Sequence, residues 1–471
     1  MKLSFFEIRE KEEFVMEQTT IAAISTPHAM GGIGIVRLSG PDARAIAARV
    51  FIPKSSRKTL KDVPGYTALY GRVQEDGQEL DDAIALVFSA PKSYTGEDVV
   101  ELSCHGGLYL MQRVLRAVLD AGAVPAQAGE FTKRAFLNGK LSLTQAEGVM
   151  DLIASQGEQA ARAALSARDG ALFQRIEQVK QDLLALSGHL SAWIDFPEED
   201  VPELSEQELS GTLCKSAGEL EDLLASYDAG QLMKNGVETA IVGRPNVGKS
   251  TLMNLLSGRE KSIVTDIPGT TRDIVENSVH LGDVILHLYD TAGIRQTDDP
   301  VEQAGVQRAK DKIETAQLIL ALFDSSQELS EEDRELVCSM QGRPCIAVVN
   351  KSDLEQKMDF SYLQEHFENL VSISAYQKTG VEQLTECVHR VLGMINLDTS
   401  SGILANERQR DCAKRALDAL REAKDAHRMG ITLDAVGVEV QSALEALMEL
   451  TGEQASERVI DEVFSKFCVG K

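Results

Sequence analysis

The 471-residue sequence lacks several features that are diagnostic of particular protein classes. It has no run of about 18 apolar residues, the length that a membrane-spanning helix requires. Its seven cysteines are odd in number and far apart, and none forms a C-x-x-C pair, so we expect neither a disulfide framework nor a zinc module. Residues 1–18 are charged and contain no apolar core, which argues against a signal peptide, and Met16 is an alternative translation start. These absences predict a cytoplasmic protein with no membrane contact.

Positive charge is also scarce. The sequence has 48 Lys and Arg residues against 73 Asp and Glu residues, which gives a formal net charge of −25 at pH 7. An excess of negative charge repels phosphate backbones at long range, so the chain alone is not expected to be a general nucleic-acid binder. Any work on RNA would need a basic partner.

The length predicts about three domains, and changes in residue composition and in the spacing of apolar residues divide the sequence accordingly. Beyond an N-terminal extension at 1–18, residues 19–139 combine glycine with short apolar runs, which predicts an α+β domain. The expected strands are 21–25, 32–40, 68–73, 82–90 and 98–107, and the expected helix is 109–122.

Residues 140–235 and 396–471 are rich in Ala, Leu, Gln and Glu, with apolar residues at helical spacing. Thr144 and Glu147 form a T-x-x-E pattern, which predicts a capping box at the first of these helices. Residues 236–395 alternate strands with helices, as in a doubly wound, mainly parallel sheet. We therefore expect a discontinuous helical domain with an α/β domain inserted into it. The expected strands of the α/β domain are 238–243, 284–290, 318–324, 345–350 and 370–375.

The sequence GRPNVGKS at 243–250 fits the P-loop pattern G-x-x-x-x-G-K-[ST], and it follows an apolar strand and opens a helix. In such a loop, backbone N–H groups and the helix N-terminus cradle phosphates. Lys249 would reach the β and γ phosphate oxygens, and the Ser250 hydroxyl would bind Mg²⁺. The motif predicts a nucleoside triphosphate site.

Three further motifs stand at strand ends and indicate the base. DTAG at 290–293 offers a carboxylate to the Mg²⁺ shell and a glycine N–H to the γ-phosphate. NKSD at 350–353 offers the Asp353 carboxylate to N1–H and the 2-amino group of guanine, a pair of donors that adenine lacks. SAY at 374–376 would close over the base. Four motifs in this order at strand ends predict guanine-nucleotide binding.

The residue that orients the attacking water is not the usual one. Ras-like enzymes carry a glutamine where this sequence has Ile294, which cannot orient water. Glu302 in the following loop is the first candidate for this role, and Asp298 and Asp299 are alternatives.

A source of positive charge at the phosphates is also not obvious. Arg272 and Arg295 are the residues to consider as an arginine finger. Asn246 in the P-loop offers a side-chain carbonyl that could hold a monovalent cation against the phosphates and supply the same charge.

These motifs, with VTDIPGTTRD at 264–273, DTAGIR at 290–295 and the terminal CVGK, closely resemble the MnmE (also called TrmE) family of tRNA-modification GTPases. The resemblance covers nearly everything from Thr19 to Lys471. Blocks outside the α/β domain that are similar to the family include TPHAMGGIGIVRLSGPDA, SYTGEDVVELSCHGG, GEFTKRAFLNGKLSLTQAE and IDFPEED.

The resemblance implies an N-terminal folate-binding domain, a discontinuous helical domain and an inserted Ras-like P-loop GTPase domain. It implies a homodimer that forms through the N-terminal domain, which would bind 5-formyl- or 5,10-methylene-tetrahydrofolate. A heterotetramer with an FAD-binding partner of the MnmG/GidA type would modify C5 of the wobble uridine in certain tRNAs. Folate would be the one-carbon source and GTP the substrate. The GTPase domains of the family pair in a potassium-dependent way.

Carried onto this sequence, the resemblance assigns roles in the GTPase domain. It makes Glu302 the catalytic glutamate. Mg²⁺ would be held by Ser250 and Thr271, and K⁺ by Asn246, Thr265, Ile267 and Thr270. With the motifs, it gives the residues expected around GTP: Asn246, Val247, Gly248, Lys249, Ser250, Thr251, Thr265, Gly269, Thr270, Thr271, Asp290, Thr291, Ala292, Gly293, Asn350, Lys351, Asp353, Ser374, Ala375 and Tyr376.

The resemblance also assigns folate contacts to Arg37, Glu101, Lys140 and Lys471. The types of residue suit the ligand. A pterin presents an N–H edge that a carboxylate such as Glu101 binds with two hydrogen bonds. The carboxylates of the glutamate tail of folate suit Arg37 or Lys140.

Cys468 stands close to the end of the sequence. Gly470 and Lys471 do not suit a prenyltransferase, so we do not expect a lipid anchor, and no second metal ligand lies nearby. Two interpretations remain. The thiol acts as a nucleophile in the folate pocket, or it is a packing residue that helps to hold Lys471 against the folate.

An alternative from another class is a ribosome-assembly or switch GTPase, which makes no covalent product. Such a protein should carry a basic RNA-binding appendage such as a KH module, and no G-x-x-G tail with basic surroundings is visible in the sequence. We therefore predict a GTP hydrolase that acts in tRNA modification.

Overall fold

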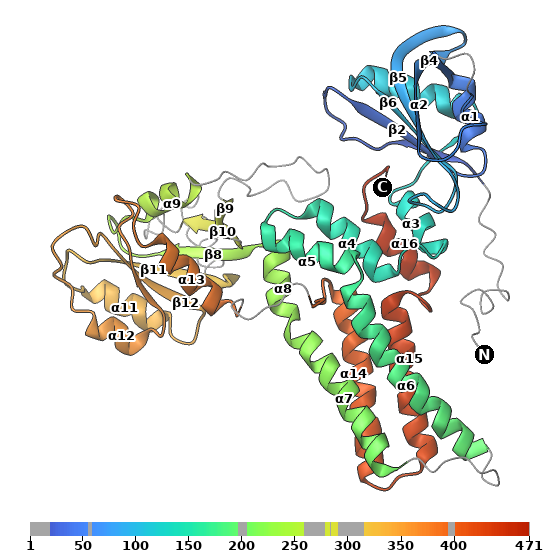
Figure 1. Ribbon diagram of the computed structural model, residues 1–471. Helices are drawn as coiled ribbons and strands as arrows, with labels where there is room; N and C mark the ends of the chain where they lie inside the picture. Colours follow the sequence, from blue (N-terminus) through green and yellow to red (C-terminus); the bar gives the residue numbers. More distant parts are fainter. Residues whose placement is uncertain are drawn as a thin grey trace, which may run out of the picture. The chain divides into compact units, whose positions relative to one another are not determined.

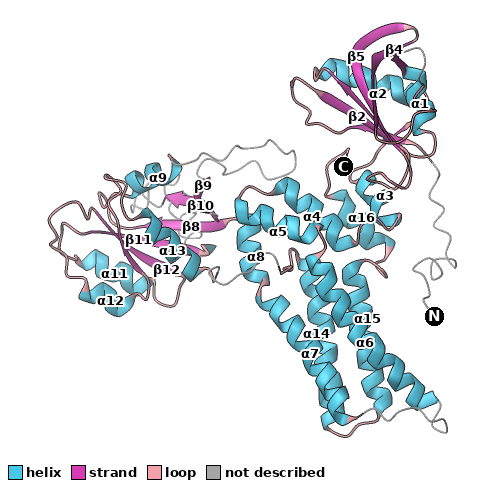
Figure 2. Cartoon of the chain, viewed as in Figure 1, coloured by secondary structure: helices cyan, strands magenta, loops and turns pink. Residues whose placement is uncertain are grey.

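The computed structural model describes residues 19–54, 59–195, 205–258, 278–282, 284–290, 315–393 and 401–470. Contacts group the chain into two compact units, Met1–Glu147 with Thr451–Lys471, and Gly148–Leu450. Figure 1 labels most of the helices and strands, and Figure 2 colours them by type. Within the described residues, no helix is both long enough and apolar enough to cross a membrane.

The first unit is built on a seven-stranded sheet in the order β3-β4-β5-β6-β2-β1-β7. Neighbouring strands are antiparallel, except that β1 and β7 are parallel. The structure confirms all five predicted strands, whereas the sequence patterns did not predict the short β3 and β7. The strands are β1 (Ile21–Ile24), β2 (Gly34–Ser39), β3 (Phe51–Pro53), β4 (Thr67–Glu75), β5 (Gln78–Phe88), β6 (Val99–Cys104) and β7 (Val124–Pro125).

Helices α1 (Ala43–Val50) and α2 (Leu108–Asp120) cover one face of this sheet, and α2 confirms the predicted helix. Because side chains alternate along a strand, β6 buries Val100 and Leu102 in the core beneath these helices. Glu101 lies between them on the opposite face, and the register pairs it directly with Arg37 of β2. The fold thus places two opposite charges side by side on that face.

The first unit also contains α3 (Glu130–Leu137), the start of α4 (Leu143–Ala154) and α16 (Glu457–Ser465). Phe464 of α16 packs against Phe136 of α3, with ring centroids 6.1 Å apart. Phe467 lies just after α16, and its ring centroid is 5.1 Å from that of Phe464. This aromatic cluster holds the end of the chain against α3.

The first turn of α4 differs from the predicted capping box. The helix begins at Leu143, so Thr144 already lies inside it. The reciprocal bonds join Ser142 and Gln145 instead. Ser142 Oγ accepts from the Gln145 N–H at 3.2 Å, and Gln145 Oε1 accepts from the Ser142 N–H at 2.9 Å. The prediction for Thr144 and Glu147 is therefore wrong, because Ser142 and Gln145 form the capping box as S-x-x-Q, two residues earlier.

In the second unit, helices from both sides of the α/β segment share one apolar core. Leu183, Leu213, Leu420 and Leu444 come from four different helices and are buried in the same cluster. Apolar residues that recur every three or four positions give each helix the face that this core requires. Besides the end of α4, the described helices of this unit outside the α/β segment are α5 (Glu158–Arg168), α6 (Ala171–Asp195), α7 (Glu206–Ala225), α8 (Tyr227–Asn235), α14 (Glu407–Arg428) and α15 (Leu433–Thr451).

The α/β segment forms a six-stranded sheet in the order β13-β12-β11-β8-β10-β9. All neighbours are parallel except β9, which runs antiparallel to β10 and was not predicted. Separate apolar clusters line its two faces, as a doubly wound sheet requires. The elements are β8 (Val237–Val242), α9 (Lys249–Ser257), β9 (Ser278–Leu281), β10 (Val284–Asp290), β11 (Leu318–Asp324), α11 (Glu331–Ser339), β12 (Cys345–Asn350), α12 (Ser361–His366), β13 (Leu370–Ser372) and α13 (Val381–Val391).

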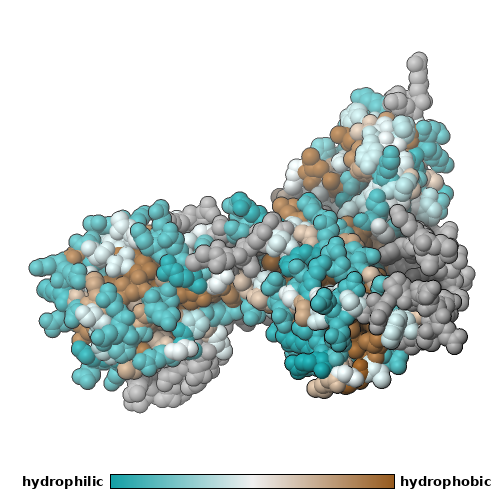
Figure 3. Space-filling view, turned by 60° about the horizontal axis from the view of Figure 1, so that its bottom comes forward, coloured by the Kyte–Doolittle hydropathy of each residue, from teal (hydrophilic) through white to brown (hydrophobic). Residues whose placement is uncertain are grey.

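The joint between α8 and β8 is tightly packed. His287 of β10 has its Nε2 2.9 Å from the Asn235 carbonyl oxygen and its Nδ1 2.8 Å from Ser278 Oγ. Gly236 follows Asn235 with φ +77°, and a Cβ there would lie 2.5 Å from the His287 ring. Glycine is therefore required at this position. On the face of the molecule that Figure 3 shows, hydrophilic residues predominate and apolar residues form smaller patches.

Candidate functional site

The P-loop lies between β8 and α9, where its backbone takes left-handed conformations. Asn246 has φ +66° and Gly248 has φ +101°. A side chain on Gly248 would collide with Nδ2 of Asn350, so this glycine is needed for space as well as for conformation. Lys249 is the first residue of α9, so the N–H groups of that helix end point at the loop. The arrangement suits an anion.

Lys249 is buried, and its ammonium lies across the loop. Nζ donates to the carbonyl oxygens of Gly243 at 2.6 Å and Arg244 at 2.9 Å. Ser250 and Thr251 follow on the first turn of α9 with exposed side chains. The ammonium and the Ser250 hydroxyl therefore belong to one short segment, as the predicted phosphate and Mg²⁺ contacts require.

The base-recognition motifs are joined to the P-loop by Asn350. Its Nδ2 donates to the Val247 carbonyl at 2.9 Å, and its Oδ1 accepts from the Ala375 N–H at 3.0 Å. Asp353 accepts a hydrogen bond from Ser374 Oγ. Asn350 and Ser374 are almost fully buried, whereas Tyr376 is 83% exposed. Three predicted motifs thus converge at the carboxyl ends of β8, β12 and β13.

Strand β10 brings the start of DTAG to the same edge of the sheet. It pairs in parallel with β8, and Asp290 is in register with Ile241. Several predicted residues lie outside the described part of the chain, so their contacts stay predictions: Thr265, Ile267, Gly269, Thr270, Thr271, Thr291, Ala292, Gly293, Glu302 and Lys471. The alternatives Arg272, Arg295, Asp298 and Asp299 lie outside it as well.

Arg37 and Glu101 form an ion pair on the sheet of the first unit. Arg37 Nε lies 2.8 Å from Glu101 Oε1, and each side chain is 17% exposed. The Arg37 guanidinium also lies 5.6 Å from the ring centroid of Phe131. Phe131 is fully buried, so its ring supports the arginine through a cation–π contact, and the partly exposed charges are what a ligand can reach. Two of the predicted folate contacts are thus neighbours.

The C-terminal tail docks at this ion pair. The Gly470 carbonyl accepts from Arg37 Nη1 at 3.2 Å and from Ser25 Oγ at 3.1 Å. Upstream, the Cys468 carbonyl accepts from the Gly129 N–H at 3.3 Å, and Val469 forms a β-bridge with Ala128. The Cys468 side chain is exposed. Sequence reasoning missed Ser25 and Gly129, because neither carries a local pattern that predicts a partner so far along the chain.

Lys140 occupies a different environment from the other predicted folate contacts. It lies in the loop after α3, is exposed, and its Nζ donates to the Pro91 carbonyl at 3.1 Å. No contact between Lys140 and the Arg37–Glu101 pair is found in the described residues. The structure therefore brings Arg37, Glu101 and Gly470 together and leaves Lys140 on a neighbouring loop.

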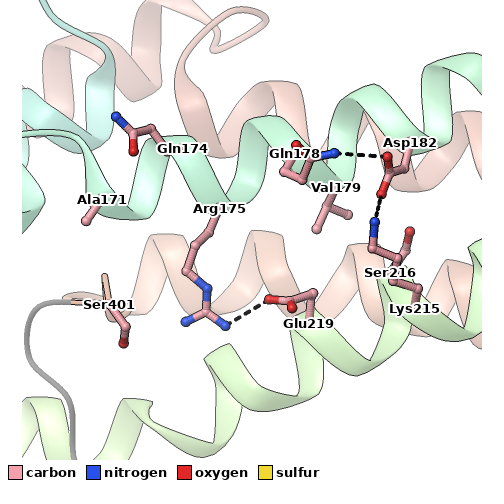
Figure 4. Close-up of a pocket in the computed structure, with 10 residues that line it drawn as sticks. All are labelled: Ala171, Gln174, Arg175, Gln178, Val179, Asp182, Lys215, Ser216, Glu219 and Ser401. Atoms are coloured by element: carbon pink, nitrogen blue, oxygen red, sulfur yellow. Dashed lines mark hydrogen bonds and ion pairs between the residues drawn. The ribbon is translucent and has the colours of Figure 1, made fainter.

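In the second unit, a polar groove of about 540 Å³ lies between α6 and α7 (Figure 4). Arg175 pairs with Glu219 at 3.0 Å across it, and Lys215 pairs with Asp182 at 2.6 Å. Figure 4 shows these pairs bridging the two helices. The groove contains none of the predicted site residues, so its charged side chains are accounted for by helix packing.

Comparisons with known proteins give matches along the chain. The family described as "GTP-binding protein TrmE N-terminus" matches residues 20–140, and "MnmE helical domain" matches residues 143–468. Among solved structures, a variant of Era from Aquifex aeolicus bound to GDP.AlF4⁻ is 26% identical and covers 38% of this chain and 65% of its own, with a TM-score of 0.24.

Two full-length relatives decide the family. The chain is 43% identical over 460 residues to "tRNA modification GTPase MnmE" of Symbiobacterium thermophilum, which covers 97% of this chain and 100% of the relative. It is 40% identical over 461 residues to the protein of the same name from Natranaerobius thermophilus, again with 97% and 100% coverage. The chain therefore belongs to the MnmE family of tRNA modification GTPases.

Proposed function

We propose that this GTPase is potassium-dependent and acts with an FAD-binding partner on certain tRNAs. The two proteins form the carboxymethylaminomethyl or aminomethyl group at C5 of the wobble uridine. A tetrahydrofolate derivative, 5-formyl or 5,10-methylene, supplies the one-carbon unit. The single observation that carries this proposal is the convergence of Arg37, Glu101 and the Gly470 tail in a unit that is separate from the GTP site.

The chemistry of the Arg37–Glu101 pair suits a folate. The Glu101 carboxylate can accept two N–H donors from the pterin edge, and such charge-assisted bonds are about twice as strong as neutral ones. Arg37 has further N–H donors, which can bind a carboxylate of the ligand. The fully buried Phe131 ring lies against the Arg37 guanidinium and helps to hold it in place. Lys140 and Lys471 would then meet the outer, acidic end of the ligand.

The docked tail gives Cys468 access to the same ligand. Its backbone is held by Gly129, and its side chain is exposed. The thiol acts either as a nucleophile on the one-carbon unit or as a packing residue beside Lys471. A Cys468→Ser variant with full modification activity would leave only the packing role, because a serine hydroxyl is a far weaker nucleophile than a thiolate.

In the GTPase site, each ion has a described residue to receive it. Asn246 is exposed in the left-handed turn of the P-loop, where its side-chain carbonyl can join Thr265, Ile267 and Thr270 around K⁺. Ser250 at the start of α9 would hold Mg²⁺ with Thr271. The bound K⁺ supplies the positive charge that an arginine finger supplies elsewhere. Glu302 orients the attacking water, and Lys249 holds the β and γ phosphates.

The partners follow from charge and from the family. A chain with a net charge of −25 needs a basic surface beside it to hold tRNA, and we assign that surface to the flavoprotein. The N-terminal domain forms the homodimer, the flavoprotein completes a heterotetramer, and the protein works in the cytoplasm. If the isolated chain bound tRNA tightly with a steep salt dependence, and the flavoprotein did not, this division of labour would be wrong.

Nucleoside analysis of tRNA tests the proposal. A strain that lacks the gene should lose the modified wobble uridine, and a plasmid with the wild-type gene should restore it. Glu101→Gln should fail to restore it while the purified variant still hydrolyses GTP, because the substitution removes the pterin acceptor and leaves the P-loop intact. Unchanged wobble uridine in the deletion strain would sink the proposal and favour a switch GTPase.

A further inference from the structure

Lys351, the second residue of NKSD, has an unusual backbone for a residue with a side chain. Its φ is +62°, in the left-handed region. Such a conformation is unfavourable for a residue other than glycine, so neighbouring groups must hold it. Strained residues that are fixed in this way cluster at ligand sites. The contacts that hold Lys351 are therefore functional candidates.

The end of β11 supplies those contacts. Strands β11 and β12 are parallel, and Asp324 is in register with Asn350, so the two strands end side by side. The Ser325 N–H donates to the Asn350 carbonyl at 2.9 Å, and Ser325 Oγ donates to the Lys351 carbonyl at 2.8 Å. Asp324 Oδ2 accepts from Lys351 Nζ at 2.5 Å. Two of these bonds hold the carbonyl and the ammonium of Lys351, and the third holds the Asn350 carbonyl in the preceding peptide bond.

Asp324 is itself a buried and fully engaged carboxylate. Its side chain is 2% exposed, and its second oxygen accepts from Ser326 N at 3.0 Å and Ser326 Oγ at 2.6 Å. Burial raises the pKa of this carboxyl, but the hydrogen bonds from Lys351 and Ser326 outweigh it, so the pKa lies below its usual value. Asp324 is therefore an anion at neutral pH.

The anchored residue leads directly to the base-reading carboxylate. The Leu354 N–H donates to the Lys351 carbonyl at 2.9 Å, which closes a turn that contains Asp353. Asp353 is held at its far end by Ser374 Oγ. The direction of the Asp353 carboxylate thus depends on Ser374 and on the turn that begins at Lys351.

We propose that Asp324 and Ser325 are positioning residues for guanine recognition. They fix Lys351 and the turn that carries Asp353, and so they set the preference for guanine over a purine without the 2-amino group. Neither residue belongs to the nucleotide motifs read from the sequence. The inference rests on guanine-nucleotide binding by this GTPase, and it is independent of folate, flavin and tRNA.

The test compares GDP with IDP, whose base lacks the 2-amino group. Both are titrated against a bound fluorescent GDP analogue on the full-length protein, with Mg²⁺ and KCl in excess. The measured quantity is the ratio of the Kd for IDP to the Kd for GDP. One charge-assisted hydrogen bond makes this ratio roughly tenfold or more in the wild type. In Asp324→Asn and in Ser325→Ala the ratio should fall by about threefold or more.

Asp333→Asn is the matched control. Asp333 is also a buried carboxylate of the same segment, paired with Arg244 at 3.2 Å, but it caps α11 through Ser330. Its loss should leave the ratio unchanged, even if both nucleotides bind less tightly. Ser325→Ala keeps the buried ion pair, so it remains informative if Asp324→Asn does not fold.

Two results would overturn the proposal. One is a Kd ratio that does not single out these residues: it is unchanged in folded Asp324→Asn and Ser325→Ala, or it falls equally in Asp333→Asn. Either outcome would mean that Asp324 contributes only to the stability of the fold. The other is a wild-type ratio near one, which would remove the assigned reading of the 2-amino group. Neither result bears on tRNA modification, which the nucleoside analysis tests separately.

Discussion

The carbonyl oxygen of Gly470 accepts a hydrogen bond from Nη1 of Arg37 at 3.2 Å, although 433 positions separate the two residues in sequence. The same arginine forms the ion pair with Glu101. One guanidinium therefore holds both the C-terminal tail and the candidate folate acceptor. A substitution at Arg37, Glu101 or Gly470 should therefore alter the contacts of the other two residues.

Glu101→Gln should weaken binding of 5-formyl-tetrahydrofolate by roughly tenfold to a hundredfold, because a neutral amide cannot accept both N–H donors of the pterin. Isothermal titration calorimetry of the purified protein measures this change. Glu79→Gln is the control, since Glu79 pairs with Arg72 at 2.7 Å on the same sheet but is 49% exposed. Exposed pairs contribute little, so its affinity should match the wild type. Equal affinity in Glu101→Gln would contradict the folate assignment.

Gly470→Ala should release the tail from the first unit. Gly470 has φ +94°, and a Cβ there would collide with the Ile24 carbonyl oxygen. Hydrogen exchange of the peptide that contains residues 466–470 should become faster, and folate affinity should fall with it. Gly139→Ala is the control, because Gly139 has φ +68° but no atom within 4 Å of an added Cβ. Similar exchange in the Gly470 variant and the wild type would argue against docking.

Asn246→Gly should remove the potassium effect on GTP turnover. In the wild type, turnover in KCl should exceed turnover in NaCl at equal ionic strength by roughly tenfold or more, since a fixed positive charge at the phosphates stabilises the transition state. Glycine keeps the left-handed backbone without strain and deletes only the carbonyl. Asn254→Ala, an exposed position on α9, should keep the difference between the salts. A wild-type enzyme with equal rates in both salts would refute the cation role.

Alkylation by iodoacetamide should divide the cysteines by burial. Burial and the nearby Asp81 raise the pKa of Cys104 to about 12, and burial raises that of Cys345 to about 12. At pH 8 only about one such thiol in 10⁴ is ionised, and that fraction grows about tenfold for each pH unit. Mass spectrometry at pH 8 should therefore find the exposed Cys214, Cys338 and Cys468 labelled first.

Labelling in urea provides the control for this experiment, because all seven cysteines should then react. Cys104 should label faster at pH 9 than at pH 7 in the folded protein, since the thiolate is the reactive form. Labelling of Cys104 at the rate of Cys214 in the native protein would show that the first unit opens readily.

The strands and the P-loop were predictable because their signals are local. Apolar runs between Gly and Pro marked the strands, although β13 ends at Ser372, before the predicted 375. Ser374 leaves the strand because it bridges to Thr379 and donates to Asp353. Strand β9 has no apolar run, because its four residues, SVHL, alternate between polar and apolar side chains and are too few to indicate a strand. The end of a strand such as β13 is thus set by competition between hydrogen bonds within the sheet and those in the following turn.

Long-range contacts were not predictable from the sequence. Gly470 meets Ser25 and Arg37 only after the whole chain has folded, so no spacing rule connects them. The motif at 350–353 gave Asp353 its role, but Asp324 stands outside every nucleotide motif. The only sequence signal for Asp324 is its position as a charged residue at the end of an apolar strand. A buried polar side chain of this kind typically needs a hydrogen-bond partner.

The packed joint at His287 has a mechanical consequence. Strand β10 carries His287 near its middle and ends at Asp290, where DTAG begins. The bond from His287 to Asn235 ties that strand to the end of α8, and Lys234 on the same turn of α8 pairs with Asp151 at 2.5 Å. Because β10 and α8 are both regular elements joined by a hydrogen bond, a displacement of one is transmitted to the other. A movement of β10 along its axis must lengthen the bond between His287 and Asn235 or move the end of α8 with it. In the second case the ion pair between Lys234 and Asp151 of α4 is displaced as well.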